Sequence, residues 1–263
     1  MGANEDDRTV ELRSGGKMPL LGFGTWQVEG PNARQVVRTA LDVGYRHIDT
    51  ATGYANEQYV GEAIADSGID RHQIFITTKC PPENVGRERE TFAASLRALQ
   101  TDHVDLWLIH WPPGGEARPD MWKVFIEVAN EGKAAAIGVS NYSTGQIDEL
   151  IEATGVAPAV NQIPWSPSLY DARRAAELAE RGVVLEGYSG LKRSRLNSPV
   201  LTEIAEAHGV TPAQVVLRWH LDHGFVVIPK SVHRERMEEN FNLYGFELTD
   251  EELMKVDDLA HLG

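Results

Sequence analysis

Four side chains that could cooperate in proton transfer follow short apolar segments in the first half of the sequence. Asp49 ends the segment RHID, and Tyr54 lies shortly after it. Lys79 ends IFITTK, and His110 ends VDLWLIH. If these segments are neighbouring parallel strands, their carboxyl ends meet at one rim. An acid, a phenol, an amine and an imidazole would then lie together.

This set of groups could protonate an oxygen atom that gains negative charge during a reaction. A tyrosine with its ordinary pKa of about 10 is a poor acid at neutral pH. A nearby ammonium group stabilises the phenolate, so we expect Lys79 to lower the pKa of Tyr54 by roughly 1–3 units. Asp49 would keep Lys79 protonated, and His110 would hydrogen-bond the substrate oxygen. Because side chains do not transfer hydride, a cofactor must supply the electrons.

Each of these residues taken alone also has an ordinary structural explanation. Asp49 could cap a helix, and Tyr54 could be a half-buried core aromatic. Lys79 could reach solvent along its apolar stem, and His110 could be a core histidine with satisfied hydrogen bonds. Their placement at consecutive strand ends favours one shared site over four separate explanations. Cys80 has no base beside it and is expected to pack rather than react.

The elements that would position these side chains alternate along the whole chain. Short apolar segments rich in β-branched residues alternate with longer segments of helical period, which is typical of a parallel sheet covered by helices. The predicted strands are 20–22, 46–49, 74–79, 104–110, 134–140, 158–163, 183–188 and 225–229. The predicted helices are 32–43, 56–67, 87–100, 119–131, 143–154, 171–181, 198–208, 211–222, 233–240 and 249–258.

Eight strands in one unbroken run favour a closed barrel over an open sheet, and a barrel of this kind needs about 250 residues. The 263-residue chain is therefore predicted to be an α/β protein with a single (β/α)8 TIM-barrel domain over 1–263. The segments TVEL and KMPL predict an N-terminal β-hairpin that plugs one end of the barrel. Residues 1–8 are expected to be loose, and extra C-terminal helices are expected after the last strand.

Composition narrows the possible partners. The formal net charge of −14 disfavours a nucleic-acid or anionic-membrane surface, because such surfaces repel acidic proteins. A single cysteine excludes an internal disulfide and fits a reducing cytosol. No apolar stretch approaches a membrane span, and the acidic start is unlike a secretory signal. We expect a cytoplasmic protein. The histidines lack HxH, HExxH or CxxC spacing, so no metal site is predicted.

Three long segments and two short ones resemble the aldo-keto reductase family. GYRHIDTATGYANEQYVG at 44–61 resembles the first signature of the family, GKAAAIGVSNY at 132–142 the second, and IPKSVHRERMEENFNL at 228–243 the third. ITTK and LWLIHWP match its lysine and histidine segments. The resemblance covers nearly the whole chain, and it is greatest to bacterial 2,5-diketo-D-gluconic acid reductase-like members.

The resemblance implies an NADP(H)-dependent reductase that converts an aldehyde or ketone to an alcohol. It assigns Tyr54 as the general acid and Lys79 and Asp49 as the groups that tune it. It assigns His110 to orient the carbonyl. The nicotinamide would be held by side chains that follow the fifth to seventh strands, namely Ser140, Asn141, Gln162 and Tyr188. The adenosine 2′-phosphate and the adenine would be bound by residues of the third motif, namely Lys230, Ser231, Arg236, Glu239 and Asn240.

The residues of the third motif support a phosphate site independently. They include a basic group on an acidic protein, formed by Lys230, His233, Arg234 and Arg236. This group precedes or begins a predicted helix, whose N-terminal amides favour anions. A basic helix face in water is the alternative. No GxGxxG turn follows a strand, so a Rossmann site is not expected. Lys192, Arg193 and Arg195 could cover the cofactor diphosphate or remain in solvent.

The substrate pocket is expected to be open. The fourth-strand loop PPGGEARPD is short, and the chain stops at Gly263. The pocket would be walled mainly by Trp26, Tyr54, His110 and Trp111. The partner would be a small-molecule carbonyl compound, and the family resemblance implies a monomer.

Two other functions stay open on the sequence. A barrel lyase would form a Schiff base through Lys79, which predicts trapping by borohydride and no need for nicotinamide. Asp49 beside the amine argues for keeping it charged, and therefore against this function. A non-catalytic NADP-binding sensor predicts tight cofactor binding with negligible turnover.

Overall fold

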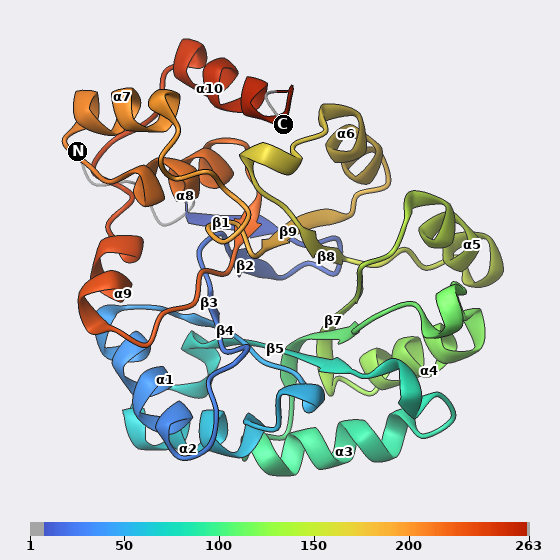
Figure 1. The fold of residues 1–263 in the computed structure, drawn as a ribbon. Coiled ribbons are helices and arrows are strands. Elements are labelled where there is room, and N and C mark those ends of the chain that lie inside the picture. The colour runs from blue at the N-terminus through green and yellow to red at the C-terminus, as the bar shows by residue number, and fades with distance from the viewer. Residues whose placement is uncertain (1–7, 262–263) are drawn as a thin grey trace.

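The computed structural model describes residues 8–261, which form a ring of helices around a central sheet (Figure 1). Of the segment expected to be loose, residues 1–7 lie outside the described residues. Arg8 is described, and its backbone oxygen accepts a hydrogen bond from the backbone nitrogen of Leu20. The Arg8 guanidinium lies 4.3 Å from the ring centre of Tyr244. The chain is therefore fixed against the fold from residue 8 onward.

The central sheet contains, within residues 8–261, eight parallel strands in the order in which they occur in the sequence. They are β3 (Phe23–Gly24), β4 (His47–Asp49), β5 (Phe75–Cys80), β6 (Val104–Ile109), β7 (Ala134–Ser140), β8 (Val160–Pro164), β9 (Val184–Tyr188) and β10 (Val226–Val227). A parallel bridge between Leu21 and Val227 joins the first strand region to the last. The predicted (β/α)8 barrel is confirmed.

The first barrel strand lies slightly later than the predicted range 20–22. β3 occupies Phe23–Gly24 because the chain pairs there with Ile48 and Asp49 of β4. The preceding residues instead bond across the closure of the barrel, where the backbone nitrogen of Gly22 donates to the oxygen of Val227. Only glycine fits at position 24, since a Cβ atom there would lie 2.9 Å from the backbone oxygen of Ile228, the residue that follows β10.

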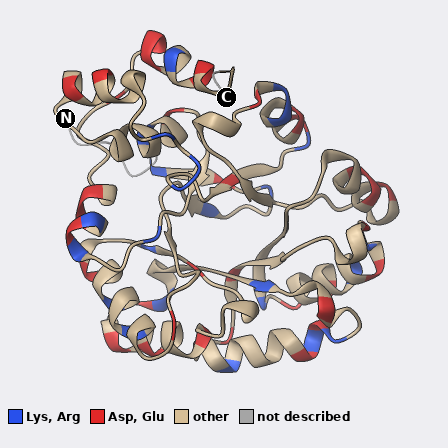
Figure 2. Cartoon of the chain, in the orientation of Figure 1, with Lys and Arg blue, Asp and Glu red and all other residues tan. Residues whose placement is uncertain are grey.

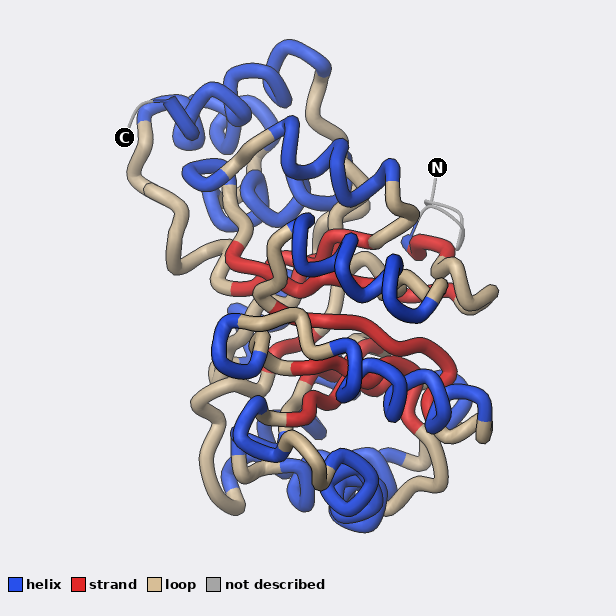
Figure 3. The backbone as a smooth tube through the Cα atoms, turned by 90° about the vertical axis from the view of Figure 1, so that its right-hand side faces the viewer, coloured by secondary structure: helices blue, strands red, loops and turns tan. Residues whose placement is uncertain are grey.

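Ten α-helices lie in the described part of the chain. They are α1 (Asn32–Val43), α2 (Glu57–Ser67), α3 (Glu88–Leu99), α4 (Pro119–Asn130), α5 (Thr144–Thr154), α6 (Ala172–Glu180), α7 (Pro199–His208), α8 (Pro212–Asp222), α9 (Arg234–Phe241) and α10 (Asp250–Asp257). α10 begins with a capping box, in which the Thr249 hydroxyl accepts from the backbone nitrogen of Glu252 at 3.2 Å. α7 and α10 pack together at the top of the molecule as drawn in Figure 1. The view turned by 90° shows helices on both sides of the strands (Figure 3).

The predicted N-terminal hairpin is also present. β1 (Thr9–Glu11) and β2 (Lys17–Pro19) pair antiparallel, and Met18 is fully buried. β2 runs directly into the first strand of the barrel, so the hairpin lies at the end of the barrel where the strands begin. The opposite end, where the strands finish, is left for the loops that carry the predicted site.

Packing around β6 shows which side chains of a strand face the helices and which face the barrel interior. The ring of Trp107 stacks 3.6 Å from that of Phe125 on α4 and lies 4.3 Å from that of Phe92 on α3. Because strand residues alternate, Leu106 and Leu108 point into the barrel. Charged residues lie mainly on the outer helices (Figure 2). No helix between residues 8 and 261 is both long and apolar enough to cross a bilayer.

Candidate active site

Strand alternation directs the predicted acid and amine toward the interior of the barrel at one rim. On β5, the hydroxyl of Thr78 donates to the Glu57 carboxylate on the covering helix α2, so the neighbouring Lys79 faces inward. Asp49 ends β4, the adjacent strand, and pairs in register with Thr77. Lys79 therefore lies one inward position beyond Asp49, which places its ammonium group near the strand ends.

The Lys79 ammonium group is the centre of the site. Its nitrogen lies 2.7 and 2.8 Å from the two carboxylate oxygens of Asp49 and 2.8 Å from the backbone oxygen of Thr50. It lies 3.3 Å from the hydroxyl of Tyr54. Lys79 is completely buried and Asp49 nearly so. The buried amine adjoins the side chain of Tyr54, which is partly exposed and lines the cavity.

His110 completes the predicted group. Its ring meets that of Tyr54 edge to face, with centroids 5.6 Å apart. It follows β6 directly, and its backbone nitrogen donates to the oxygen of Cys80 at 2.9 Å, which extends the β5–β6 ladder. The structure thus brings Asp49, Tyr54, Lys79 and His110 together, although they come from three different strands and loops.

The electrostatics of the site differ from the sequence-based expectation in one respect. Burial raises the pKa of Tyr54 above its ordinary value, and the charge of Lys79 only opposes that rise. The expected net lowering is therefore wrong, because removal of water from the phenolate outweighs one cation. Burial would lower the pKa of Lys79, but Asp49 and Tyr54 raise it above its ordinary value. Burial, with the charge of Lys79, lowers the pKa of His110 to about 3, so this imidazole is neutral at pH 7.

A cavity of about 900 Å³ opens above this group, and most of the predicted site residues line it. Trp26 and Trp111 each expose 48% of their surface and form part of its wall, as expected for the substrate pocket. The predicted residues that line it are Trp26, Asp49, Tyr54, His110, Trp111, Ser140, Asn141, Gln162, Tyr188 and Lys230.

Comparison with known proteins agrees with this geometry. Residues 20–261 match the sequence family described as the aldo/keto reductase family. The chain belongs to the aldo-keto reductases. It is 40% identical over 261 residues to methylglyoxal reductase DkgA of Escherichia coli strain K12, covering 97% of this chain and 95% of the relative. It is 42% identical over 255 residues to glyoxal reductase of Bacillus subtilis strain 168, covering 95% and 92%.

Solved structures of similar chains superpose closely on this one. An aldo/keto reductase from Brucella melitensis is 40% identical, with a TM-score of 0.92 over 95% of this chain and 98% of that chain. A mutant of Gox0644, solved in complex with NADPH, is 34% identical, with a TM-score of 0.90 over 95% and 93%. The barrel and its helices are therefore those of the family.

In this aldo-keto reductase, the residues expected to hold a nicotinamide form one hydrogen-bonded network. The hydroxyl of Tyr188 donates to the amide oxygen of Asn141 at 2.8 Å, and the amide nitrogen of Asn141 lies 3.0 Å from the hydroxyl of Ser140. The amide nitrogen of Gln162 donates to Asp49 at 2.8 Å. Gln162 therefore also restrains the Asp49 carboxylate, a contact that the sequence did not predict.

Asn141 adopts a left-handed backbone conformation, with φ of 65°. Asparagine tolerates this conformation better than most residues, and here it turns the side chain back toward the rim after β7. The Asn141 amide also donates to the backbone oxygen of His110 at 3.2 Å. The network thus connects the loop after β6 to the loop after β7 and to the end of β9.

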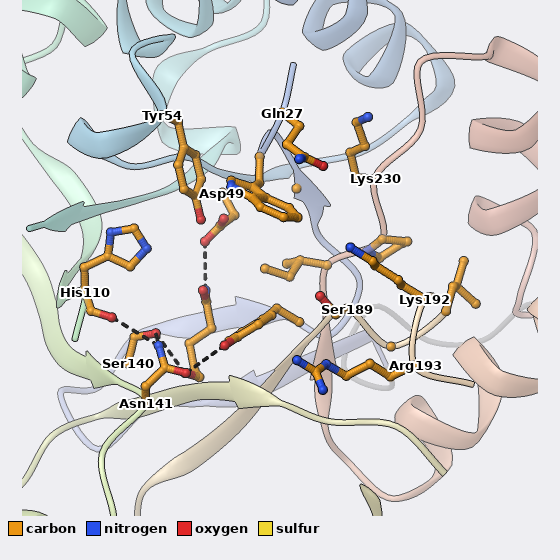
Figure 4. Close-up of a pocket in the computed structure, with 18 of the residues that line it drawn as sticks. Gln27, Asp49, Tyr54, His110, Ser140, Asn141, Ser189, Lys192, Arg193 and Lys230 are labelled. Atoms are coloured by element: carbon orange, nitrogen blue, oxygen red, sulfur yellow. Dashed lines mark hydrogen bonds between the residues drawn. The ribbon is translucent and has the colours of Figure 1, made fainter. Parts of the chain in front are cut away.

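The opposite side of the cavity carries cations (Figure 4). Lys192, Arg193 and Lys230 line it there, facing the Tyr54 and His110 side. All three are exposed, and none forms an ion pair with another residue of the described range. The sequence left open whether the loop after β9 covers the cofactor diphosphate or remains in solvent. Lys192 and Arg193 of this loop line the cavity, which favours contact with a ligand. This donor set fits a phosphate-bearing dinucleotide.

The remaining residues of the third motif lie beside the cavity rather than in its wall. The hydroxyl of Ser231 accepts from the backbone nitrogen of His233 at 3.1 Å, just before α9 begins. Arg236 is exposed on α9. Glu239 accepts from the hydroxyl of Thr211 at 2.9 Å, and Asn240 is buried. Their expected contacts with an adenine and its phosphate stay predictions.

Sequence reasoning missed two buried titratable residues inside the barrel, Glu186 and His47. Both are completely buried. Alternation could have found them, since His47 lies two residues before Asp49 and Glu186 two before Tyr188, each on the same strand face as its neighbour. Gln27 in the cavity wall was also missed, and no signal pointed to it.

Two further expectations concern metal and thiol chemistry. Over the described part of the chain, no group of three His, Cys, Asp or Glu side chains is placed to hold a metal ion. Cys80 is buried at the end of β5, and burial raises the pKa of its thiol to about 12. A protonated, buried thiol is a packing residue, as expected.

Proposed function

We propose that this aldo-keto reductase is an NADP(H)-dependent oxidoreductase that reduces small aldehydes and ketones to alcohols. The observation that carries the proposal is the placement of the Tyr54 hydroxyl 3.3 Å from the Lys79 ammonium, at the floor of a cavity. A phenol held beside a buried cation can give up a proton at low cost when a substrate oxygen becomes negative.

The proposed reaction divides between the cofactor and the side chains. When bound, the dinucleotide supplies hydride to the carbonyl carbon. Tyr54 donates its proton to the carbonyl oxygen, which completes the alcohol, and the resulting phenolate is stabilised by Lys79. Asp49 and the backbone oxygen of Thr50 hold Lys79 in place. The raised pKa of Tyr54 keeps the acid protonated at neutral pH until the substrate oxygen is basic enough to take the proton.

His110 would orient the carbonyl. Because its pKa is lowered to about 3, the ring is neutral at pH 7 and can donate one N–H hydrogen bond to the substrate oxygen. A neutral donor directs the oxygen toward Tyr54 without adding a second cation beside Lys79. Tyr54 is therefore the acid in this proposal and His110 the positioning donor.

The cofactor would lie along the cavity from the catalytic side to the cationic side. Ser140, Asn141 and Gln162 offer amide and hydroxyl groups for the nicotinamide carboxamide, and Tyr188 offers its ring for stacking. Lys192 and Arg193 face the expected path of the diphosphate. The 2′-phosphate and adenine would be bound by the third-motif residues Lys230, Ser231, Arg236, Glu239 and Asn240. A 34% identical relative has been solved with NADPH, which supports this choice of cofactor.

The substrate is proposed to be a small reactive carbonyl compound. Two relatives at 40–42% identity are named methylglyoxal reductase and glyoxal reductase. The exposed rings of Trp26 and Trp111 give this pocket apolar walls that suit a small carbonyl compound. The proposal includes a monomer acting in the cytoplasm.

The structure argues against the lyase alternative. A Schiff base needs an accessible neutral amine, whereas Lys79 is completely buried and has a raised pKa. The sensor alternative differs from the proposal in turnover alone.

The decisive experiment is an NADPH-oxidation screen over aldehydes, α-keto esters, diketones and keto sugars. We expect turnover on small aldehydes or dicarbonyls, and a loss of about 10²–10⁴-fold in Tyr54→Phe with nearly unchanged NADPH affinity. NADPH binding without turnover on any carbonyl would favour the sensor. Full turnover in Tyr54→Phe would remove Tyr54 from its role.

A further inference from the structure

Glu186 is a buried carboxyl group beneath the site that the mechanism above does not use. It lies at the centre of β9 and is completely inaccessible to solvent. Between residues 8 and 261, neither of its carboxylate oxygens has a hydrogen-bond partner of good geometry. The Gln162 amide is near enough to favour the ionised form of Glu186, but burial and the charge of Asp49 disfavour that form more strongly. A bare carboxylate in such a place would lose its hydration without compensation, which strongly disfavours the charged form.

The groups that face Glu186 do not compensate a negative charge. From β4, the imidazole nitrogen Nε2 of His47 lies 3.7 Å from a Glu186 oxygen, and burial lowers the pKa of His47 to about 3, so this ring is neutral. The same nitrogen lies 3.1 Å from the hydroxyl of Thr77 on β5. Asp49, also on β4, is itself negative.

The remaining neighbours complete the charge balance. On β8, the residue in register with Glu186 is the uncharged Gln162, and on β10 it is the apolar Val226. The cation in this set is Lys79 on β5, and it already pairs with Asp49 at 2.7 Å. Tyr54 is the remaining titratable group above Lys79. An ionised Glu186 would therefore leave the buried set with one uncompensated negative charge.

We propose that Glu186 carries a proton in the working enzyme and is a positioning residue for the proton donor. Its neutral carboxyl leaves Asp49 as the single counter-ion of Lys79, so the Lys79 charge remains available to the Tyr54 phenolate. The inference rests on the proposed role of Tyr54 as the acid. Burial, followed by the charge of Asp49, raises the pKa of Glu186 to about 8, in agreement with a protonated state at pH 7.

The sign of the effect on catalysis follows from charge. Above about pH 8, Glu186 loses its proton and adds a negative charge close to Lys79 and Tyr54. That charge disfavours the phenolate that proton donation creates, so carbonyl reduction becomes slower. Tyr54 itself ionises only at much higher pH, because its own pKa is raised. The first alkaline loss of activity is thus assigned to Glu186.

The first test needs no turnover. Infrared spectra of the wild-type protein, unlabelled and labelled with ¹³C-glutamate, would show a protonated carboxyl band at pH 6–7 that disappears as pH rises through about 8. The band should be absent in Glu186→Gln. Absence of any protonated glutamate band at pH 6–7 would overturn the proposal. A band that remains in Glu186→Gln, and is lost in Glu57→Gln instead, would overturn it as well.

The second test measures kcat/KM for reduction against pH, each profile scaled to its own maximum. Glu186→Gln should move the alkaline limb upward by about one pH unit or more, whereas Glu186→Asp, which keeps an ionisable group, should not. Glu57→Gln is the matched control: Glu57 is also buried, but it accepts hydrogen bonds from Thr78 and Ser95 and should leave the limb in place. An unmoved limb in Glu186→Gln contradicts the proposal.

The two tests separate this inference from the proposed function. If Tyr54→Phe retains full turnover, the acid role fails while the infrared band can still report a protonated Glu186. If Tyr54→Phe is inactive and the infrared band is missing, the function stands and the inference fails.

Discussion

The two sides of the cavity are built in opposite ways (Figure 4). On the proton-donating side, Lys79 is completely buried and pairs with Asp49 at 2.7 Å. On the cationic side, Lys192, Arg193 and Lys230 are exposed to solvent. The charges proposed to act on a proton are fixed by the fold itself, whereas those proposed to bind phosphate remain hydrated and need a ligand for neutralisation.

Because of this difference, substitutions on the two sides of the cavity should affect different properties of the protein. A buried pair is expensive to break, because removing one partner leaves the other desolvated and unpaired. Exposed cations cost little to change, and their attraction for anions is screened by salt. Variants on the proton-donating side should therefore change turnover and stability together. Variants on the cationic side should change affinity and salt dependence, and leave stability nearly unaltered.

The largest effect is expected from Lys79→Met. The variant should lose turnover by at least about 10²-fold, because the Tyr54 phenolate loses its cation. It should also lose about 3–5 kcal/mol in the free energy of unfolding, because Asp49 is left unpaired. Urea unfolding and NADPH-oxidation rates measure the two losses. The double variant Asp49→Asn/Lys79→Met should recover stability but not turnover. If Lys79→Met keeps both its turnover and its unfolding free energy, the proposed difference between the two sides of the cavity is wrong.

A second prediction uses pH on the buried side. The pKa of Glu186 is raised from 4.5 to about 8, so its contribution to stability is fully present below about pH 4.5 and is lost as pH rises to about 8. Glu186→Gln has no such loss. The unfolding free energy of this variant relative to wild type should therefore rise between pH 5 and 8, at about 1.4 kcal/mol per pH unit at most, and level off above pH 8. If the difference in unfolding free energy between the variant and wild type does not change with pH, the raised pKa of Glu186 is contradicted.

The sequence predicted that Asp49, Tyr54, Lys79 and His110 lie together, and it did so for a physical reason. Period-two alternation and strand ends decide which side chains reach the rim of a parallel barrel, so Asp49 and Lys79 could be placed together from spacing alone. The barrel, the hairpin and the helix order followed from the same periodicity. Residue spacing does not show how far a side chain is removed from water, however. The predicted direction of the Tyr54 pKa shift is therefore wrong, because it depends on burial.

The cationic side was less predictable. Lys192 and Arg193 lie in an irregular loop, where no periodicity fixes the direction of a side chain. The sequence therefore could not decide whether they face a ligand or solvent, whereas the structure places both in the cavity wall. Glu186 could have been noticed as a charge on an inward strand position, but its lack of partners depends on residues far apart in the sequence. Gln162 bonding to Asp49 across the barrel is a contact of the same kind.

The third prediction concerns cofactor choice on the cationic side. Lys230→Gly with Arg236→Ala should narrow the preference for NADPH over NADH by about 10–100-fold, because two cations expected to face the 2′-phosphate are removed. Binding titrations at several salt concentrations would measure it, and the unfolding free energy should change little. The matched control is Arg234→Ala, since Arg234 already pairs with Glu238 at 2.8 Å on the same helix. An unaltered NADPH/NADH ratio would refute the phosphate assignment.

The smallest effect is expected from Lys192→Met. The Lys192 ammonium lies 5.5 Å from the ring centre of Trp26, across the cavity mouth, where it could meet the cofactor diphosphate. Loss of one exposed cation should weaken NADPH binding by about 2–5-fold at low salt and by less at high salt, with stability unchanged. Quenching of tryptophan fluorescence by NADPH measures the affinity. Lys123→Met, an exposed lysine on α4 away from the cavity, controls for net charge. Equal weakening in both variants would mean that net charge, rather than a local contact, attracts the dinucleotide to this side.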